Sequence, residues 1–181
     1  HEEMKFEAYK PEQSRQITEL FSDVFTDSEG ETEGALISRL VLELMNNTQD
    51  EDIYGFVARD NGQITGSIFF TRLTFNTPIQ AFILAPVAVD TSQQGKGIGQ
   101  NLINYGIEQL RADGVQLVCT YGDPKFYSKT GFKSITEDII QAPRKLSQPE
   151  GWLCQSLEGG EITPVPERPR CVSAFDKPEY W

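Results

Sequence analysis

The chain has 181 residues, a length typical of one domain with a sizeable hydrophobic core. Its formal net charge of −11 argues against non-specific binding to nucleic acid, because the phosphates would be repelled. The same acidity either favours cationic partners such as amines or simply keeps the protein soluble. No run of about 18 apolar residues occurs, which argues against a membrane span.

The histidine and cysteine content excludes several classes of catalytic and metal-binding site. The only histidine, His1, stands in the tripeptide before Met4, and we interpret residues 1–3 as a remnant of the expression vector. Ser-His-Asp triads, Cys-His pairs and histidine zinc sites are therefore excluded, and no metal site is predicted. The three cysteines are odd in number and form no C-x-x-C pair, which predicts reduced thiols in a cytoplasmic protein.

Apolar residues recur at strand or helix spacing along most of the chain. In chain order the predicted elements are a strand at 4–9, a helix opened by Pro11, a helix with its apolar stripe at 36–44, strands at 56–59, 64–70 and 79–89, a helix at 98–110, a strand at 115–121, a short helix at 123–129, a strand starting at 132 and a further strand at 152–157. This order indicates a mixed α/β or α+β sheet covered by helices.

Turn residues mark the boundaries of these elements. The run Asp27-Ser28-Glu29-Gly30 is expected to break the first helix, and Gly114 to end the helix at 98–110. Asn61-Gly62 supplies the positive φ angles of a tight hairpin turn. Pro124 fits the first position of the short helix, and Gly131 its end.

The most informative segment runs from Leu84 to Gln100, where a strand leads through a polar loop into a glycine-rich turn that opens a helix. The start of such a helix offers backbone N–H groups without intrahelical partners and the positive end of the helix dipole. Glycines let the backbone approach a ligand closely. The segment therefore predicts an anion site suited to phosphate.

The order of the glycines narrows the choice of phosphate ligand. The P-loop pattern is absent, and the dinucleotide pattern G-x-G-x-x-G fails because position 100 is Gln. The run Gln94-Gly95-Lys96-Gly97-Ile98-Gly99 fits Q/R-x-x-G-x-G/A and resembles the acetyl-CoA pyrophosphate loop of the GNAT superfamily of N-acyltransferases. The alternatives are a glycine-rich helix start without a ligand and a site for another phosphate compound such as a nucleotide.

A second segment extends the resemblance. The run 121–132 contains, at 122–132, the form Gly-Asp-Pro-x-Phe-Tyr-x-x-x-Gly-Phe, which is similar to a bacterial branch of predicted N-acetyltransferases. The resemblance covers about residues 4–140. It implies a mostly antiparallel sheet that splays at the cofactor strand, where Pro86 lacks the N–H that a ladder needs. Alternatively, Pro86 only marks an irregular strand.

The resemblance also implies roles for individual residues. Tyr127 would be the general acid that protonates the departing thiolate, although its ring could instead serve packing alone. One main-chain N–H of the cofactor strand would polarise the thioester carbonyl. Acetyl-CoA, the expected cosubstrate, would be bound by Val87, Ala88, Val89, Gln94, Gly95, Lys96, Gly97, Ile98, Gly99 and Gln100.

The sequence does not identify which residue acts as the general base. Glu31, Glu33 and Asp90 are candidates, but each carboxylate also suits a helix start or the surface, and a chain of waters is a further alternative. Many relatives have an asparagine at the start of the short helix, where this chain has Thr120-Tyr121-Gly122-Asp123. A side-chain contact of that asparagine with the cofactor is therefore not expected here.

We expect residues 4–140 to form the acyltransferase domain and residues 141–181 to form an extension packed on it. This tail is expected to close over the acceptor pocket, to wrap the surface and bury Trp152 and Trp181, or to pack a homodimer interface with its aromatic residues. The predicted activity is acetyl transfer from acetyl-CoA to a primary amine of a small molecule or peptide. The competing hypothesis is a non-catalytic acyl-CoA-binding sensor or partner module.

Overall fold

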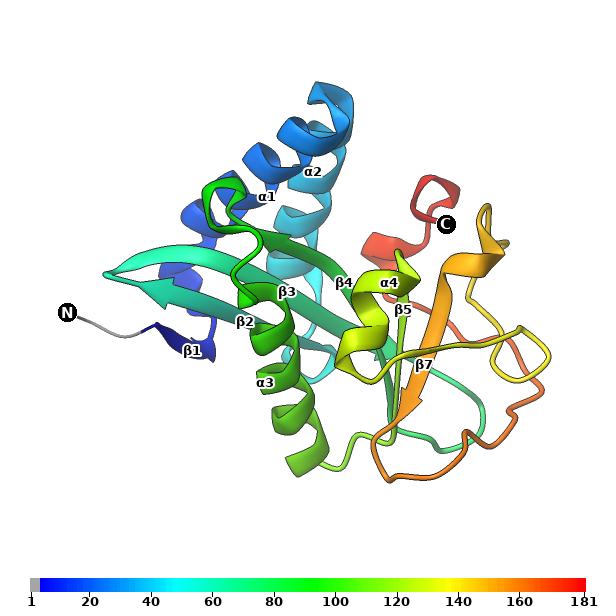
Figure 1. Cartoon of the computed structure of the whole chain (residues 1–181). Coiled ribbons are helices and arrows are strands. Elements are labelled where there is room, and N and C mark those ends of the chain that lie inside the picture. Colours follow the sequence, from blue (N-terminus) through cyan, green and yellow to red (C-terminus); the bar gives the residue numbers. More distant parts are fainter. Residues whose placement is uncertain (1–3) are drawn as a thin grey trace. The chain divides into compact units, whose positions relative to one another are not determined.

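The structure is a computed structural model that describes residues 4–181, so the tripeptide interpreted as a vector remnant lies outside the described residues. Within residues 5–69 and 86–106, helices lie on both faces of the sheet (Figure 1). The strands are β1 Lys5–Ala8, β2 Ile53–Asp60, β3 Gln63–Leu73, β4 Ala81–Val89, β5 Leu117–Tyr121, β6 Lys133–Ser134 and β7 Trp152–Ser156. The α-helices are α1 Ser14–Glu29, α2 Glu31–Asn47, α3 Ile98–Ala112 and α4 Pro124–Tyr127.

The seven strands form one sheet in the order β1-β2-β3-β4-β5-β7-β6. The pairs β1–β2, β5–β7 and β6–β7 are antiparallel, whereas β4 and β5 run parallel. The parallel ladder joins Ala81–Leu84 of β4 to Leu117–Thr120 of β5 and includes none of the last five residues of β4. The prediction of a mixed, mostly antiparallel sheet that splays at this strand is confirmed.

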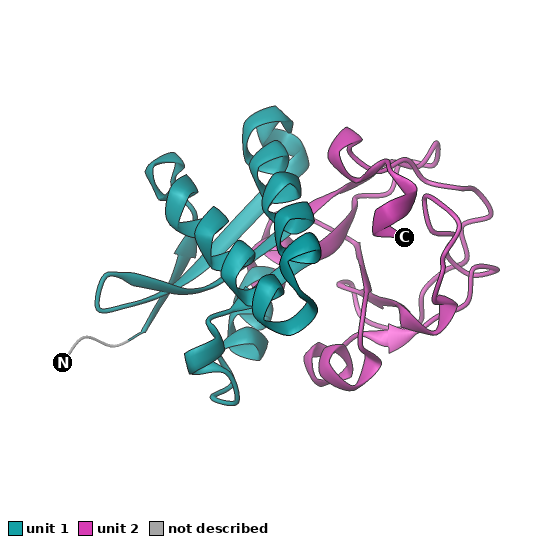
Figure 2. Ribbon diagram, turned by 90° about the horizontal axis from the view of Figure 1, so that it is seen from above, with its two compact units in different colours: residues 1–69, 86–106 teal, residues 70–85, 107–181 magenta. Residues whose placement is uncertain are grey.

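The chain divides into two compact units, coloured separately in Figure 2. Unit 1 comprises residues up to 69 and 86–106, and unit 2 comprises 70–85 and 107–181. Each unit thus contains parts of β3, β4 and α3. The domain limits expected from the sequence, 4–140 and 141–181, remain a prediction.

In unit 1, α1 and α2 form a tight helical hairpin. Gly30 turns the chain with φ +98°, a backbone conformation that costs glycine little. Gly34 then lies so close to α1 that a Cβ atom would stand 1.9 Å from Oγ1 of Thr26. On the sheet side, the buried ring of Phe21 packs against Phe69 of β3 at a centroid distance of 6.0 Å. The α1–α2 hairpin is therefore both closely joined and anchored to the sheet.

Two further glycines shape unit 1. The β2–β3 hairpin turns at Asn61 and Gly62, with φ +51° and +79°, as the sequence predicts. On β3, a Cβ at Gly66 would lie 3.3 Å from side-chain atoms of Ile98 and Leu102 and 3.5 Å from the carbonyl oxygen of Ala88. Glycine thus lets the first turns of α3 pack closely on the sheet.

In unit 2, the tail packs around the two tryptophans. Trp152 and Trp181 are both buried, which agrees with the wrapping alternative for these rings. The carbonyl oxygen of Trp181 accepts hydrogen bonds from the Tyr121 hydroxyl, at 2.7 Å, and from the backbone N–H and hydroxyl of Ser147. The Tyr121 and Trp181 rings stack at 6.0 Å.

The structure corrects some predicted boundaries. The first helix does not break at Asp27, because α1 runs to Glu29 and only Gly30 leaves the helical conformation. The strand expected from residue 79 begins at Ala81, and the strand expected from Phe132 has only two residues, Lys133–Ser134. The proline-rich segment 161–170 is irregular apart from isolated β-bridges at Val165 and Arg170.

Candidate active site

In unit 1, the loop that follows β4 is fixed by Asp90. Its Oδ1 accepts hydrogen bonds from the backbone N–H of Ser92 at 2.9 Å and from the Ser92 hydroxyl at 2.8 Å. These bonds cap the 3-10 turn Thr91–Gln93, because a short carboxylate can accept from the backbone two residues on. Asp90 therefore has the helix-start role that the sequence offered as the alternative to a catalytic base.

The glycine turn that follows has the conformation and the space of a phosphate cradle. Gly95 and Gly97 have φ +84° and +79°, values that side chains with a Cβ rarely adopt. A Cβ at Gly95 would meet nothing within 4 Å, and one at Gly97 would meet only Nδ2 of Asn101, at 3.9 Å. The protein itself thus leaves the space above both glycines open.

The first turn of α3 offers free backbone donors. The first helical bond runs from the Asn101 N–H to the Gly97 carbonyl oxygen, at 3.0 Å. Within residues 4–181, the N–H groups of residues 95–100 have no hydrogen-bond acceptor. Lys96 is exposed, and its Nζ lies 3.1 Å from Oε1 of Gln93. This arrangement of free amides, positive dipole end and nearby ammonium group suits a diphosphate.

The loop also contacts the strand that is predicted to bind the cofactor. Nε2 of Gln94 donates to the carbonyl oxygen of Val89 at 3.1 Å. Val87, Ala88 and Val89 lie beyond Leu84, where the ladder with β5 ends. The structure thus brings the predicted strand and loop residues together in unit 1.

In unit 2, Tyr127 stands in α4, whose start is capped by Asp123 through a bond from the Lys125 N–H to Oδ1, at 3.0 Å. The Tyr127 ring meets Phe126 and Phe132 edge-on, at centroid distances of 5.0 and 5.9 Å. It also covers Gly122, where a Cβ would stand 2.8 Å from the ring. Glycine is therefore required at position 122 for the observed ring position.

The Tyr127 hydroxyl is held in its neutral form. Burial is the main cause that raises the pKa of Tyr127 to about 12, and the nearby Asp123 carboxylate adds to it, whereas a hydrogen bond with the Thr120 side chain acts in the opposite direction. The Thr120 hydroxyl also donates to the carbonyl oxygen of Leu84 at 2.8 Å. At neutral pH, Tyr127 therefore retains the proton that a general acid needs.

This pKa shift makes the stability of the protein depend on alkaline pH. Between pH 10 and 12, unfolded Tyr127 loses its proton while the folded form keeps it, so stability falls as the pH rises. We expect wild type to lose at most about 2.7 kcal/mol more unfolding free energy over this range than Tyr127→Phe. Urea unfolding at pH 9, 10, 11 and 12 measures the difference, and parallel curves would contradict it.

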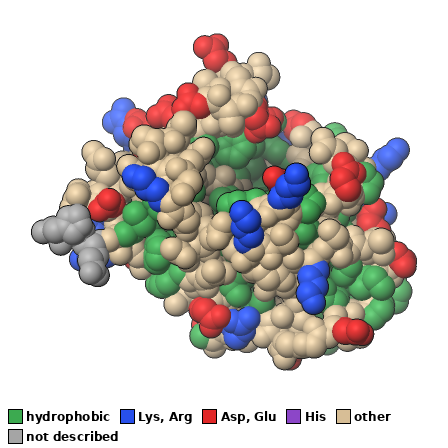
Figure 3. Space-filling model, viewed as in Figure 1, with side chains coloured by type: hydrophobic (Ala, Val, Ile, Leu, Met, Phe, Trp, Pro, Cys, Tyr) green, Lys and Arg blue, Asp and Glu red, His purple; other side chains and the backbone are tan. Residues whose placement is uncertain are grey.

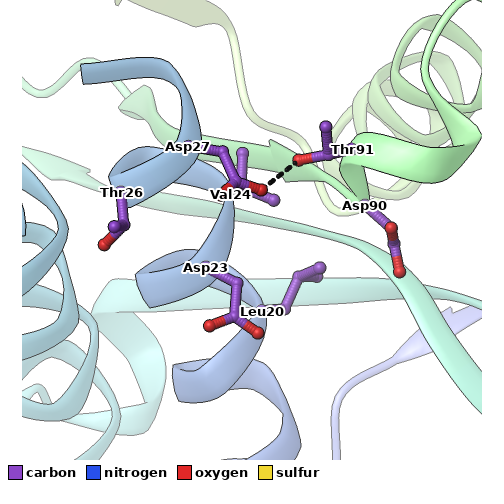
Figure 4. A pocket seen from close by; sticks show the side chains of 7 residues that line it. All are labelled: Leu20, Asp23, Val24, Thr26, Asp27, Asp90 and Thr91. Carbon is purple, nitrogen blue, oxygen red and sulfur yellow. Dashed lines mark hydrogen bonds between the residues drawn. The ribbon is translucent and has the colours of Figure 1, made fainter. Parts of the chain in front are cut away.

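A pocket of about 310 Å³ lies in unit 1 beside the loop (Figure 4). Residues of α1 form one wall, and residues 90 and 91 form the other, where Thr91 donates to Oδ2 of Asp27 at 3.0 Å. Three carboxylates are among its lining residues, which are Leu20, Asp23, Val24, Thr26, Asp27, Asp90 and Thr91. Figure 3 shows more acidic side chains gathered over the nearby α1–α2 turn. The pocket thus favours a cation.

Sequence reasoning missed two of these carboxylates. Asp23 and Asp27 are four residues apart on α1 and so share one helix face, which was the available signal. Glu31 and Glu33 were considered as bases instead, but they occupy the first turn of α2 and do not line the pocket. Within residues 4–181, no group of three His, Cys, Asp or Glu side chains is arranged to hold a metal ion.

The fold is an α/β domain whose glycine turn presents free backbone amides at the start of α3. A family model described as the acetyltransferase (GNAT) domain matches residues 5–135. The chain is also 35% identical over 130 residues to the uncharacterized N-acetyltransferase YjhQ of Escherichia coli K12, covering 68% of this chain and 72% of that protein. The chain therefore belongs to the GNAT acetyltransferase family.

Solved structures share the fold. The GNAT family N-acetyltransferase YhbS of Escherichia coli, in complex with CoA, superposes with a TM-score of 0.82 at 23% identity, covering 98% of this chain and 96% of that one. A GNAT acetyltransferase of Brucella melitensis, in complex with acetyl-CoA, gives a TM-score of 0.72 at 24% identity over 97% and 100%. In the described part of this chain, no helix is both long and apolar enough to cross a membrane.

Proposed function

We propose that the protein transfers the acetyl group of acetyl-CoA to a primary amine of a small molecule or peptide by direct attack. The observation that carries this proposal is the open glycine turn, whose free amides lead into α3 beside β4. The CoA and acetyl-CoA complexes of proteins with the same fold support the choice of cosubstrate.

The proposal gives each predicted residue a role. The amides of residues 95–100 bind the pyrophosphate, with Lys96 adding charge and Gln94 holding the loop to Val89. The main chain of Val87–Val89, free of the β5 ladder, pairs with the pantetheine arm and polarises the thioester carbonyl. The amine attacks that carbonyl carbon, the C–S bond breaks, and Tyr127 protonates the departing thiolate.

Two finer assignments belong to the same proposal. The Gly-Asp-Pro-x-Phe-Tyr run at 122–127 supports membership of a bacterial branch of the family. Three free cysteines support a reducing compartment, which we take to be the cytoplasm. The base is assigned to no single residue, because Asp90 is engaged with Ser92 and the remaining pocket carboxylates, Asp23 and Asp27, are exposed.

Release of free CoA tests the activity. The full chain is incubated with acetyl-CoA and a panel of primary amines, and free thiol is titrated over time. Transfer to any amine above the background hydrolysis supports the enzyme. Thermal protection by acetyl-CoA without thiol release on any amine would instead identify a non-catalytic binding module, and protection by ATP or NAD but not by CoA would point to another phosphate ligand.

The acidic pocket makes a prediction about the acceptor. If a cationic amine docks there, Asp23→Asn removes one attractive charge and raises KM for a diamine about two- to fivefold, the effect of one exposed ion pair. The turnover number should stay the same, and the effect should shrink at 0.5 M salt because exposed charges are screened. Initial rates at varied amine concentration measure both parameters.

Glu29→Gln is the matched control, because Glu29 is also exposed on α1 but does not line the pocket. It removes the same net charge and should leave KM within the error of wild type. Equal changes in the two variants would mean that only the overall charge matters, and the pocket would lose its proposed role.

A further inference from the structure

Two cysteines face each other on neighbouring strands of unit 2. Cys119 of β5 and Cys154 of β7 are direct partners in the antiparallel register. Both side chains are fully buried, and both are free thiols. The proposed acetyl transfer uses neither of them, so this pair needs an explanation of its own.

The hydrogen bonds of the β5–β7 ladder show whether Cys119 and Cys154 form a hydrogen-bonded or a non-hydrogen-bonded pair. At one end, the Gly122 N–H donates to the Gly151 carbonyl oxygen at 2.9 Å, and at the other end the Leu157 N–H donates to the Gln116 carbonyl oxygen at 2.9 Å. Hydrogen-bonded and non-hydrogen-bonded pairs alternate along an antiparallel ladder. Position 119 lies three residues from both ends, so Cys119 and Cys154 form a non-hydrogen-bonded pair.

This geometry permits a covalent bond between the two side chains. Cα atoms of a non-hydrogen-bonded pair are about 4.5 Å apart, with the side chains close together. Disulfides span Cα distances of about 4.4–6.8 Å. The two strands are therefore already close enough for an S–S bond without a change of register.

The thiols also interact with each other. The pKa of Cys154 is raised well above its usual value, first by burial and then by the hydrogen bond and charge interaction with Cys119. Because the thiolate is the reactive form, this shift keeps Cys154 in its slow-reacting thiol form at neutral pH. The third cysteine, Cys171, is half-buried, and it has no cysteine opposite it in any strand pair of the described residues.

We propose that Cys119 and Cys154 are a redox modification site that forms a reversible cross-strand disulfide between β5 and β7. With a small peroxide as oxidant, one sulfur attacks the peroxide oxygen, which gives a sulfenic acid and releases water. The second thiol then displaces the hydroxyl group as a second water, and the S–S bond forms. Two electrons pass from the thiols to the peroxide, and a dithiol reductant reverses the reaction.

The site lies next to a catalytic element of the proposed enzyme. Thr120 follows Cys119 in β5 and interacts with the Tyr127 hydroxyl. The disulfide itself depends only on the facing thiols, so it stands whether or not the chain transfers acetyl groups.

Thiol counting tests the proposal on the full chain. The reduced protein is exposed to hydrogen peroxide for several hours, quenched with catalase, denatured and labelled with N-ethylmaleimide. Reduced protein takes three labels, one for each cysteine. We expect oxidised protein to take one label, at Cys171, and to yield a peptide pair linked through Cys119 and Cys154 that separates on reduction with dithiothreitol.

Cysteine variants identify which two residues form the disulfide. Cys171→Ser should lose both remaining labels on oxidation, and it keeps the test valid if a core variant fails to fold. Cys119→Ala should keep two labels under the same treatment. Three labels on wild type after a dose that oxidises a free thiol peptide, or label loss through sulfinic acid without the linked peptides, would overturn the proposal.

Discussion

Replacing Gly97 by alanine is expected to raise the dissociation constant of CoA at least tenfold. The backbone at this position has φ +79°, and the space above it is open except for Asn101 Nδ2 at 3.9 Å. A Cβ would therefore enter the space that we propose for the phosphates without colliding with the protein. Isothermal titration calorimetry with CoA and with acetyl-CoA measures the change.

Gly62→Ala separates backbone strain from loss of the ligand site. Gly62 has the same φ of +79°, nothing lies within 4 Å of its Cβ position, and it stands in the β2–β3 turn. Both variants should lose about 1–2 kcal/mol of stability, because a Cβ is unfavourable in the left-handed region. Only Gly97→Ala should lose CoA affinity. Equal affinity of the two variants would remove the glycine turn from the cofactor site.

Tyr127→Phe is expected to lower turnover at least tenfold while the affinity for acetyl-CoA stays within twofold of wild type. A positioned proton donor contributes about 10²–10⁴-fold to a rate. With a pKa of about 12, the hydroxyl is a weaker acid than the thiol formed when the thiolate is protonated, so we expect an effect at or below the lower end of that range. Single-turnover acetyl transfer and calorimetry give the two quantities.

Tyr105→Phe provides the matched control. Tyr105 is half-buried like Tyr127 and packs against Phe6 and Phe56 in unit 1, with no part in the proposed chemistry. Its loss of a hydroxyl should leave turnover unchanged. If Tyr127→Phe also turned over at the wild-type rate, Tyr127 would have only the packing role that its contacts with Phe126 and Phe132 already provide.

Local signals in the sequence predicted the fold well. The Asn61-Gly62 turn, Gly95 and Gly97 have the positive φ angles that their residue types indicate, whereas Gly99 already belongs to α3. The first helix was predicted to end too early, because Asp27 and Ser28 favour caps and turns but cost too little within a helix to stop it, and Glu29 is a good helix former. The single glycine at position 30 is sufficient to end the helix.

Features that depend on distant residues could not be predicted in the same way. The pocket beside Asp90 exists because α1 packs next to the end of β4, and no spacing within either segment reports that contact. The bridge between Thr74 and Arg170 joins segments almost a hundred positions apart. The facing of Cys119 and Cys154 likewise depends on the β5–β7 register, which the tail determines.

The close approach of Gly34 to Thr26 has a consequence for how the pocket meets its ligand. With backbone against side chain at this point, the close packing resists a shift of α1 along α2. The α1 wall that carries Asp23 and Asp27 is therefore preorganised. If an amine docks there as proposed, it meets a closely packed, negatively charged surface, and the cost of ordering that wall is met during folding rather than during binding.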